Sequence, residues 1–597
     1  MLGTSWHHPG LGFQRVGTSA PSFSSVFSSV LVCCCALFCS EDSVKTPVVA
    51  IGLDAADPVV LEEWMSQGHL KNLSRIREQG AYGRLENVVN YCGVPTPAAS
   101  TERLWAMTWT GCMPDKTGFW GTSKFYPESY GIDRDILKVG CDFEQHPPFY
   151  ALGEDYRIFV LDPPTSGLSS QVNGLQVLAW GGHYPFTPSV SVPAEVLPEM
   201  IREYGENPVL YKDDGIWWDK AYEKWVPGAI QDSVERRARI CRDYLKKEDW
   251  DFFFVGFGEA HTAGHDLWYT HYDHPVYEYH GKPAGPLMRE AFEHIDRAIG
   301  EILDAAPENA YITLFSPHGM GANYTDLLSM AVLLEMMYRF NFGKAAIAPG
   351  NPNEEPGPVI SHPFRKSWMG EMWARNYEQN PLKRALRPYL PSKLLRDRLN
   401  GLESPYVLME QNAPLFWMPA MWYRPLWSQM QAFALPYFAD GHVRINVQGR
   451  EGSGIVPPSE YDAVCEAVIE KIWKLKDART GKSIVRQISR TRRTPFDEGN
   501  LSDADIVVVW EEVITDVVDS PDFGRIGPIP HFRAGGHRSR GFFMAQGPGI
   551  APNSTIERGQ ALDIAPTILG LLGAPIPDRL DGTPLLEVSS IRSATAR

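Results

Sequence analysis

The chain has 597 residues, of which 44% are hydrophobic and 12% aromatic, and its formal net charge at pH 7 is −16. This composition excludes a disordered chain, because it supplies enough apolar surface to build a sizeable core. The acidic balance argues against a nucleic-acid-binding surface, which requires clustered Lys and Arg.

Residues 1–45 form a leader with an apolar run at 26–39 that contains four of the nine cysteines. The run has the length of a signal-peptide apolar region and is too short to predict a transmembrane anchor. Arg15 and two histidines are its only preceding positive groups. Two interpretations therefore remain: an export signal, with a secreted or periplasmic protein, or a disordered or misassigned leader on a cytoplasmic one.

Three apolar runs predict buried strands, at 46–58, 251–261 and 310–319, and the stretch 285–306 has apolar residues at helical spacing. Continuous β-branched and aromatic runs are typical of strands covered on both faces. Their alternation with helices predicts an α/β fold with a doubly wound, mostly parallel sheet. The active site of such a fold lies at the carboxyl ends of the strands.

Between 324 and 440 the periodic pattern gives way to Trp-, Pro- and Met-rich sequence. Long irregular segments inside compact domains are usually lids or binding loops, so we expect an aromatic-rich insertion that covers the site. The predicted organisation is a first part of the core at 46–323, the insertion at 324–440, and a second part of the core at 441–597.

Asp54 and Thr101 are the first candidates for chemistry. Asp54 follows the first predicted strand, and Thr101 stands before a short helix that ends at Gly111. Either side chain could simply cap a helix. A hydroxyl at a helix N-terminus also suits a nucleophile, because the first-turn amides point where a phosphoryl oxyanion would lie.

Four histidines also follow or lie near predicted strand ends. His261 and His265 are four residues apart, which places them on one face if the segment is helical. His318 ends another strand, and His537 lies in a Gly-rich turn. His261 and His265 could each be an ordinary surface histidine, but neutral imidazole is the commonest metal ligand. Together with Asp54 they predict a metal-bound hydrolytic site.

A set of motifs in fixed order now points to a family: "IGLDAADP", "KNLSRIREQGAYGRL", "TGCMPDKTG", "AGH", "SPHGMG", "GGHRSRGFFMAQGPGI" and "LDIAPTILGLLGAPIPDRLDGTPL". From about Val48 to Leu586 the chain resembles the type I phosphodiesterase/nucleotide pyrophosphatase group of the alkaline phosphatase superfamily. The resemblance implies two metal ions, usually zinc, held by Asp and His, and a Thr or Ser that forms a covalent phospho-intermediate.

By position, Asp54 matches the first-strand metal ligand of that group. Thr101, nine residues before the Thr of the "TG" pair, matches the nucleophile. The resemblance further implies metal ligation by His265, His318 and His537.

Two positions depart from the pattern, because His261 and Pro317 each stand where the family has an Asp. His261 keeps a ligand and gives a three-histidine site with an open coordination position. Pro317 cannot ligate, so the second site would retain only Asp54, His318 and the Thr101 hydroxyl and would bind a metal more weakly.

One divalent ion or two are therefore expected. Zinc is the first choice, and Mn, Mg or Ca are alternatives at the altered second site. Glu102, Glu259 or Asp57 could replace the ligand that is lost at Pro317. Each could instead be an ordinary helix-start or surface acid.

The expected function is metal-assisted hydrolysis of a small phosphorylated substrate, a phosphodiester or a pyrophosphate, through Thr101. The alternatives are a catalytically impaired binding protein and another hydrolase of the superfamily, a phosphomonoesterase or a sulfatase. The sequence "ERL" after Thr101 lacks the C/S-x-P-x-R context of a sulfatase. The aromatic insertion would hold the leaving group, unless its rings are plain packing residues.

Overall fold

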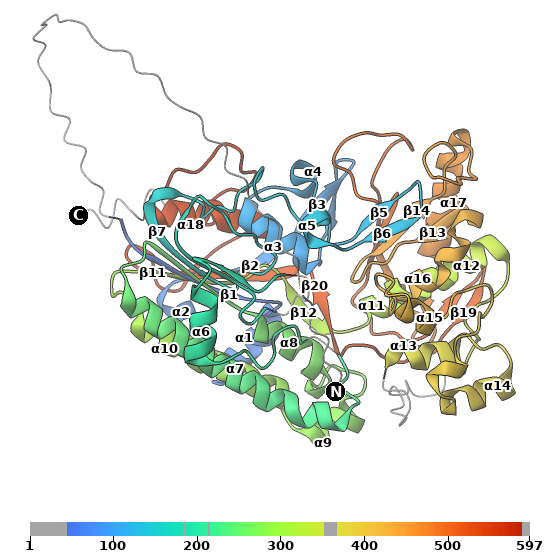
Figure 1. Cartoon of the computed structure of the whole chain (residues 1–597), viewed down its shortest axis with the longest axis horizontal. Coiled ribbons are helices and arrows are strands. Elements are labelled where there is room, and N and C mark those ends of the chain that lie inside the picture. Colours follow the sequence, from blue (N-terminus) through green and yellow to red (C-terminus); the bar gives the residue numbers. More distant parts are fainter. Residues whose placement is uncertain (1–44, 183–186, 213–214, 352–366, 588–590, 592–597) are drawn as a thin grey trace, which may run out of the picture. The chain divides into compact units, whose positions relative to one another are not determined.

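The computed structural model describes residues 45–182, 187–212, 215–351, 367–587 and 591 (Figure 1). The predicted leader therefore lies outside the described residues, apart from Lys45. Within the described ranges we find no helix with the length and apolar character needed to cross a lipid bilayer.

A nine-stranded sheet forms the centre of the fold, in the order β22-β2-β21-β11-β1-β10-β7-β8-β9 (Figure 1). Its strands are β1 (Val48–Leu53), β2 (Ala81–Glu86), β7 (Gly153–Leu161), β8 (Val172–Leu178), β9 (Val190–Val192), β10 (Phe252–Phe257), β11 (Tyr311–Ser316), β21 (Arg540–Gln546) and β22 (Ser554–Thr555). The five strands from β11 to β8 run parallel, whereas β21 pairs antiparallel with both β11 and β2. The predicted mostly parallel α/β sheet is confirmed.

Helices cover both faces of this sheet, which explains the continuous apolar runs of its central strands. Alternate residues of β1 enter two different cores, Val49 and Ile51 on one face and Val48 and Ala50 on the other. The first core includes α7 (Lys220–Lys247) and α10 (Leu287–Ala305), and the second includes α3 (Thr101–Thr110) and α18 (Ile564–Leu572). A strand buried on both faces has no polar side to alternate with.

The aromatic-rich stretch 324–440 is more regular than its sequence suggests. It contains α12 (Leu333–Phe342), α14 (Pro381–Leu386) and several shorter helical turns. Its last strand, β13 (Ala432–Ala434), pairs with β14 (Gly441–Ile445) in an antiparallel sheet that continues to β17 (Ile506–Trp510) and β16 (Val485–Arg490). The pattern was misleading because tertiary packing of the aromatic side chains, not helical periodicity, fixes these short elements.

The carboxyl ends of β1, β10 and β11 lie side by side, because these strands are parallel neighbours. β10 runs directly into α8 (Gly258–Leu267), and β11 is followed by β12 (Gly319–Ala322). β12 forms a two-stranded antiparallel ribbon with β20 (Gly535–Arg538), in which Met320 is opposite His537. This ribbon brings a residue from far along the chain to the same edge of the sheet.

Candidate active site and metal centre

Asp54 directly follows the last residue of β1, Leu53, and is fully buried. It is not a helix cap: the N-cap of α1 (Pro58–Ser66) is Asp57, whose side chain accepts a hydrogen bond from the Val59 amide. One carboxylate oxygen of Asp54, Oδ1, accepts a hydrogen bond of 2.7 Å from the indole nitrogen of Trp105. The same oxygen lies 3.2 Å from Nε2 of His318. Asp54 and His318 therefore form a buried pair.

Thr101 is the first residue of α3, after Ser100 at the N-cap position. The capping interpretation of Thr101 is therefore wrong. The Thr101 hydroxyl is almost completely buried, and its oxygen lies 3.1 Å from Nε2 of His537. At the N-terminus of a ten-residue helix the hydroxyl shares the region where backbone amides attract an anion.

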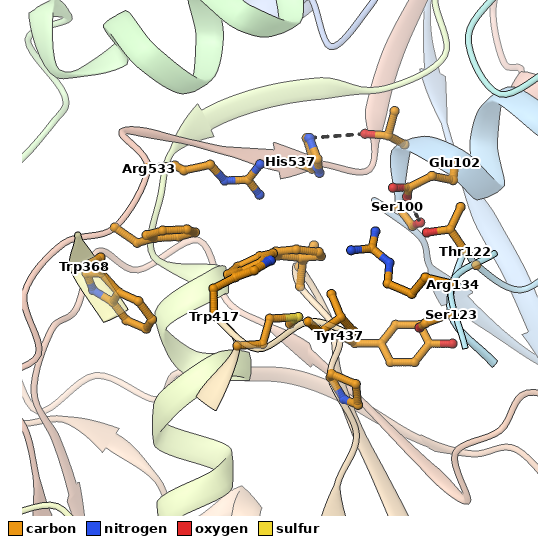
Figure 2. A pocket seen from close by; sticks show the side chains of 18 of the residues that line it. Ser100, Glu102, Thr122, Ser123, Arg134, Trp368, Trp417, Tyr437, Arg533 and His537 are labelled. Atoms are coloured by element: carbon orange, nitrogen blue, oxygen red, sulfur yellow. Dashed lines mark hydrogen bonds between the residues drawn. The ribbon is translucent and has the colours of Figure 1, made fainter. Parts of the chain in front are cut away.

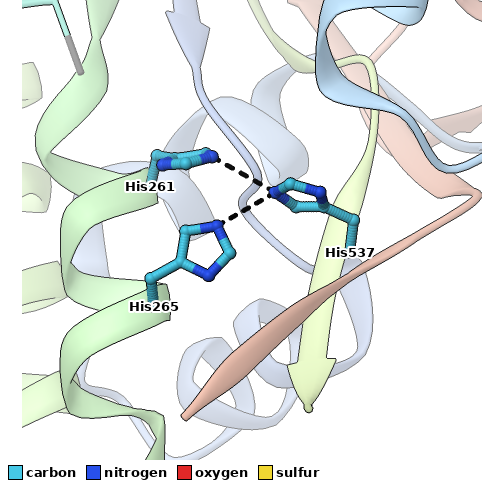
Figure 3. A group of neighbouring side chains, drawn as sticks. All are labelled: His261, His265 and His537. Carbon is cyan, nitrogen blue, oxygen red and sulfur yellow. Dashed lines mark hydrogen bonds between the residues drawn. The ribbon is translucent and has the colours of Figure 1, made fainter. Parts of the chain in front are cut away.

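His261 and His265 lie one turn apart on α8 and point toward His537 on β20 (Figure 3). Nε2 of His537 is 3.2 Å from Nε2 of His261 and 3.1 Å from Nε2 of His265. Among the described residues, these three make up the single group of at least three His, Cys, Asp or Glu whose ligand atoms all lie within 4.8 Å of one another.

The close approach of β20 to α8 orients one of these rings. A Cβ on Gly535 would lie 2.3 Å from the carbonyl oxygen of Gly264, so only glycine permits this contact. Nδ1 of His265 is 2.7 Å from the Gly535 carbonyl oxygen, which can only accept a hydrogen bond. Nδ1 therefore carries the proton, and Nε2 presents its lone pair to the other imidazoles.

Two of the three nitrogen separations are compatible with one shared tetrahedral cation such as zinc. Two nitrogens bound to one tetrahedral zinc at about 2.0–2.1 Å are roughly 3.3 Å apart. The separations of His537 Nε2 from its two neighbours, 3.1 and 3.2 Å, are close to that value. A neutral imidazole with its other nitrogen hydrogen-bonded to a carbonyl is the usual form of a metal ligand.

The Asp54–His318 pair gathers fewer donors. Pro317 supplies only its carbonyl oxygen, which accepts a hydrogen bond from the Asn87 amide. Two of the acids considered as compensating ligands form ion pairs with arginines. Asp57 Oδ2 lies 2.9 Å from Arg540 Nε, and Glu259 Oε1 lies 2.9 Å from Arg237 Nη2. Neither acid is available for the site at this edge of the sheet.

A cavity of about 530 Å³ opens from Thr101 and His537 (Figure 2). Its opposite wall is aromatic and comes largely from the segment 324–440. In Figure 2, Trp368, Trp417 and Tyr437 lie across the pocket from His537. The ring of Trp417 stacks on Phe532 at a centroid distance of 5.9 Å. Glu102, the third acid considered, lines this pocket and accepts a hydrogen bond from Ser100.

Asp440 is a buried acid on the wall of the same pocket. Burial raises the pKa of its carboxyl group to about 6, against the opposing attraction of the Arg103 guanidinium. Arg103 is itself buried and donates a hydrogen bond to the Trp120 carbonyl oxygen at 3.0 Å. His442 is also buried and stacks on Tyr437 at 3.7 Å, and burial holds its pKa well below the usual range.

The structure brings all six predicted site residues to one edge of the sheet. They form two adjacent groups, since the rings of His318 and His537 are 5.2 Å apart at their centroids. The six residues are Asp54, Thr101, His261, His265, His318 and His537. Sequence reasoning missed Trp105, the partner of Asp54, and the acid Asp440. Trp105 lies four residues after Thr101 on α3, so helical spacing could have indicated its direction.

The sequence profile described as type I phosphodiesterase/nucleotide pyrophosphatase matches residues 48–357, a little more than half of the chain. Comparison with curated protein sequences gives no match.

Solved structures that resemble the chain include phosphonoacetate hydrolase from Sinorhizobium meliloti 1021, in complex with phosphonoformate. It shares 12% identity over 89% of this chain and 96% of that chain, with a TM-score of 0.43. Human ectonucleotide pyrophosphatase/phosphodiesterase 5 shares 11% identity over 92% of this chain and 99% of that chain, also with a TM-score of 0.43. At TM-scores of 0.43, neither structure identifies the activity of this chain. On the profile match, the chain belongs to the type I phosphodiesterase/nucleotide pyrophosphatase family and is a hydrolase of that type.

Proposed function

We propose that the chain hydrolyses phosphodiesters or pyrophosphates with a divalent cation, zinc in the first instance, held by His261, His265 and His537, and with Thr101 as nucleophile. The observation that carries this proposal is the convergence of one ring nitrogen from each of three histidines within 4.8 Å, with the Thr101 hydroxyl oxygen 3.1 Å from Nε2 of His537. Such a cation would neutralise charge on the transferring phosphoryl group and lower the pKa of a nearby hydroxyl.

The chain's own residues would perform two successive displacements. Thr101 Oγ1 would form a bond to phosphorus while the ester or anhydride bond to the leaving group breaks. The hydroxyl proton would pass to solvent, and the leaving oxygen would depart as an anion or take a proton from solvent. Water would then break the Oγ1–P bond, releasing phosphate or a phosphomonoester and restoring the hydroxyl. The amides at the start of α3 would donate to the phosphoryl oxygens throughout both displacements.

Asp54 and His318 would hold a second cation more weakly than the three histidines hold the first. Two side chains, with the Thr101 hydroxyl, are a small ligand set for a dinuclear site. Trp105 would orient Asp54 through its hydrogen bond of 2.7 Å. Oxygen-rich sites accept Mn, Mg or Ca as well as zinc.

The leaving group would occupy the aromatic side of the cavity. A volume of about 530 Å³ suits a small organic molecule. Trp417 and Tyr437 line this side of the cavity, where a planar group could pack against their rings. We accordingly expect diesters with an aromatic leaving group to be better substrates than those with a small alkyl group.

The test is hydrolysis of nitrophenyl phosphodiesters, phosphomonoesters and sulfates by purified protein, before and after chelation and metal add-back. Thr101→Ala should lower diester turnover by more than about 1,000-fold. Its metal content, measured by elemental analysis, should stay close to that of the parent. Thr101→Ser is the matched control, because it keeps the hydroxyl and should retain measurable turnover.

Chelator-resistant hydrolysis, or full activity in Thr101→Ala, would contradict the proposal. A folded protein with less than one bound ion per chain and no turnover would favour the alternative of a catalytically impaired binding protein. Faster hydrolysis of the monoester or the sulfate than of the diester would favour the other hydrolases of the superfamily.

A further inference from the structure

A cluster of exposed apolar side chains lies in and after α14, on the right of Figure 1. Leu382 is 77% exposed, Leu386 65%, Tyr389 60% and Leu394 61%. In the part of the chain that the structure describes, these are four of the five large apolar side chains with at least 60% exposure. Single exposed apolar residues are ordinary, but four within 13 positions mark an interaction surface.

Buried anchors fix the backbone beneath these side chains, so their exposure does not come from a loose loop. Arg387 is buried and donates two hydrogen bonds to Asp397, of 2.8 and 3.0 Å. Leu395 is fully buried, and its carbonyl oxygen accepts hydrogen bonds from Trp373 and Ser404. The segment therefore holds its apolar side chains outward.

The charge around the apolar side chains has the opposite sign to that of the chain as a whole. Residues 381–394 contain four basic residues and no acidic one, whereas the net charge of the chain is −16. Lys383 and Lys393 are exposed. We call the set Leu382, Lys383, Leu386, Tyr389, Lys393 and Leu394 the basic apolar patch.

We propose that the basic apolar patch docks the protein on the surface of an anionic phospholipid bilayer. Tyrosine suits the headgroup boundary, where its ring is buried and its hydroxyl stays in water, and leucine side chains can be buried at the acyl boundary. Lysines at the rim attract anionic headgroups. Because the net charge of the chain is −16, we expect this basic stretch to be a surface that faces the anionic bilayer.

Docking is independent of the proposed hydrolytic chemistry, because no patch residue lines the cavity at Thr101. The experiment is co-sedimentation of the full chain with vesicles of phosphatidylcholine alone or with about one third phosphatidylserine. We expect binding to the anionic vesicles only, and weaker binding as the salt concentration rises.

Two variants test the two components of the patch. Leu386→Ser with Tyr389→Ser should weaken vesicle binding by about 10-fold or more, and Lys383→Glu with Lys393→Glu by about 10-fold or more. Matched controls are Phe496→Ser, at an apolar side chain that is 52% exposed outside the patch, and Lys224→Glu with Lys246→Glu at exposed lysines elsewhere. Both controls should bind like the parent, and all variants should keep the rate on a soluble nitrophenyl diester.

Failure of the parent to bind anionic vesicles, or parent-like binding by both patch variants, would overturn the proposal. So would a dimer, seen by light scattering without lipid, that Leu386→Ser disperses, since the patch would then join two copies of the chain. Binding of an acidic protein that occludes the patch while vesicles are ignored would assign the surface to a protein partner instead.

Discussion

The two halves of the site lie at the same edge of the sheet but differ in how many donor atoms they gather. The half made of His261, His265 and His537 presents three imidazole nitrogens, drawn together by α8 and β20. The half made of Asp54 and His318 presents a single pair, 3.2 Å apart. Pro317, the residue before His318, has no side-chain donor to add to this pair.

This difference teaches that a site's two halves can differ in donor number although both are built from largely buried, hydrogen-bonded side chains. The backbone around Pro317 keeps its hydrogen bond to Asn87, and Asp54 keeps its contact with Trp105. Because a site with fewer ligands generally binds a metal more weakly, we expect the two halves to differ in metal occupancy.

Removing one of the three histidines His261, His265 and His537 should have the largest effect on metal content and hydrolysis. His265→Ala leaves two imidazoles, so we expect bound metal to be lost and diester hydrolysis to fall by more than about 100-fold. Elemental analysis and initial rates measure both. His294→Ala, at a histidine on α10 outside the site, is the control. Full metal content in His265→Ala would show that the three nitrogens do not share an ion.

A smaller loss of metal affinity or activity is expected when Asp54 loses the hydrogen bond that it accepts from Trp105. Trp105→Phe removes the hydrogen bond to Asp54, and loss of such supporting partners usually costs about 10–100-fold in activity or metal affinity. Trp109→Phe is the matched control, since the Trp109 indole stacks on Trp105 but donates to the Pro164 carbonyl oxygen. Equal losses in the two variants would point to packing rather than to Asp54.

A carboxylate at position 317 should strengthen metal binding by Asp54 and His318. In Pro317→Asp we expect the metal content to rise from about one ion per chain toward two, with hydrolysis increased roughly 10-fold. Pro317→Ala, which removes the ring without adding a ligand, separates this gain from a backbone effect. No added ion in Pro317→Asp would mean that residue 317 does not face the second half.

The smallest effect concerns Asp440, an acid that belongs to neither half. Burial raises the pKa of its carboxyl group from the ordinary value of 3.8 to about 6. The folded state therefore binds this proton more tightly than the unfolded state, and the parent loses stability as the pH rises from about 4 through 6.

Asp440→Asn removes that dependence. Its Tm, measured from about pH 4 to 8, should rise relative to the parent by a few degrees as the pH passes 6. A Tm difference that does not change with pH would show that Asp440 keeps an ordinary pKa.

The sequence located the site because its residues follow strand ends. Parallel neighbours such as β1, β10 and β11 end at one edge, so Asp54, His261 and His318 had to lie near one another. The order of motifs added His537, although it is 483 residues from Asp54 in the chain. That all these side chains bind metal stays a prediction.

The remaining contacts could not be predicted because they depend on which buried groups meet across elements. Glu259 and Asp57 looked like free acids near the site, but Arg237 and Arg540 neutralise them. A local pattern shows that a residue starts a helix, not which arginine from another element lies opposite. The short helices of 324–440 were missed for the same reason, since ring packing and not periodicity defines them.

The β12–β20 ribbon has a mechanical consequence. It joins the segment that follows His318 to the strand that carries His537, with Met320 opposite His537. A slip of one position along this ladder would turn the His537 ring to the opposite face. Four residues of the two strands are glycines: Gly319, Gly321, Gly535 and Gly536. They allow neighbouring groups to approach closely, but they leave few side chains to resist such a slip. The spacing between His318 and His537 therefore depends on the pairing of these two strands.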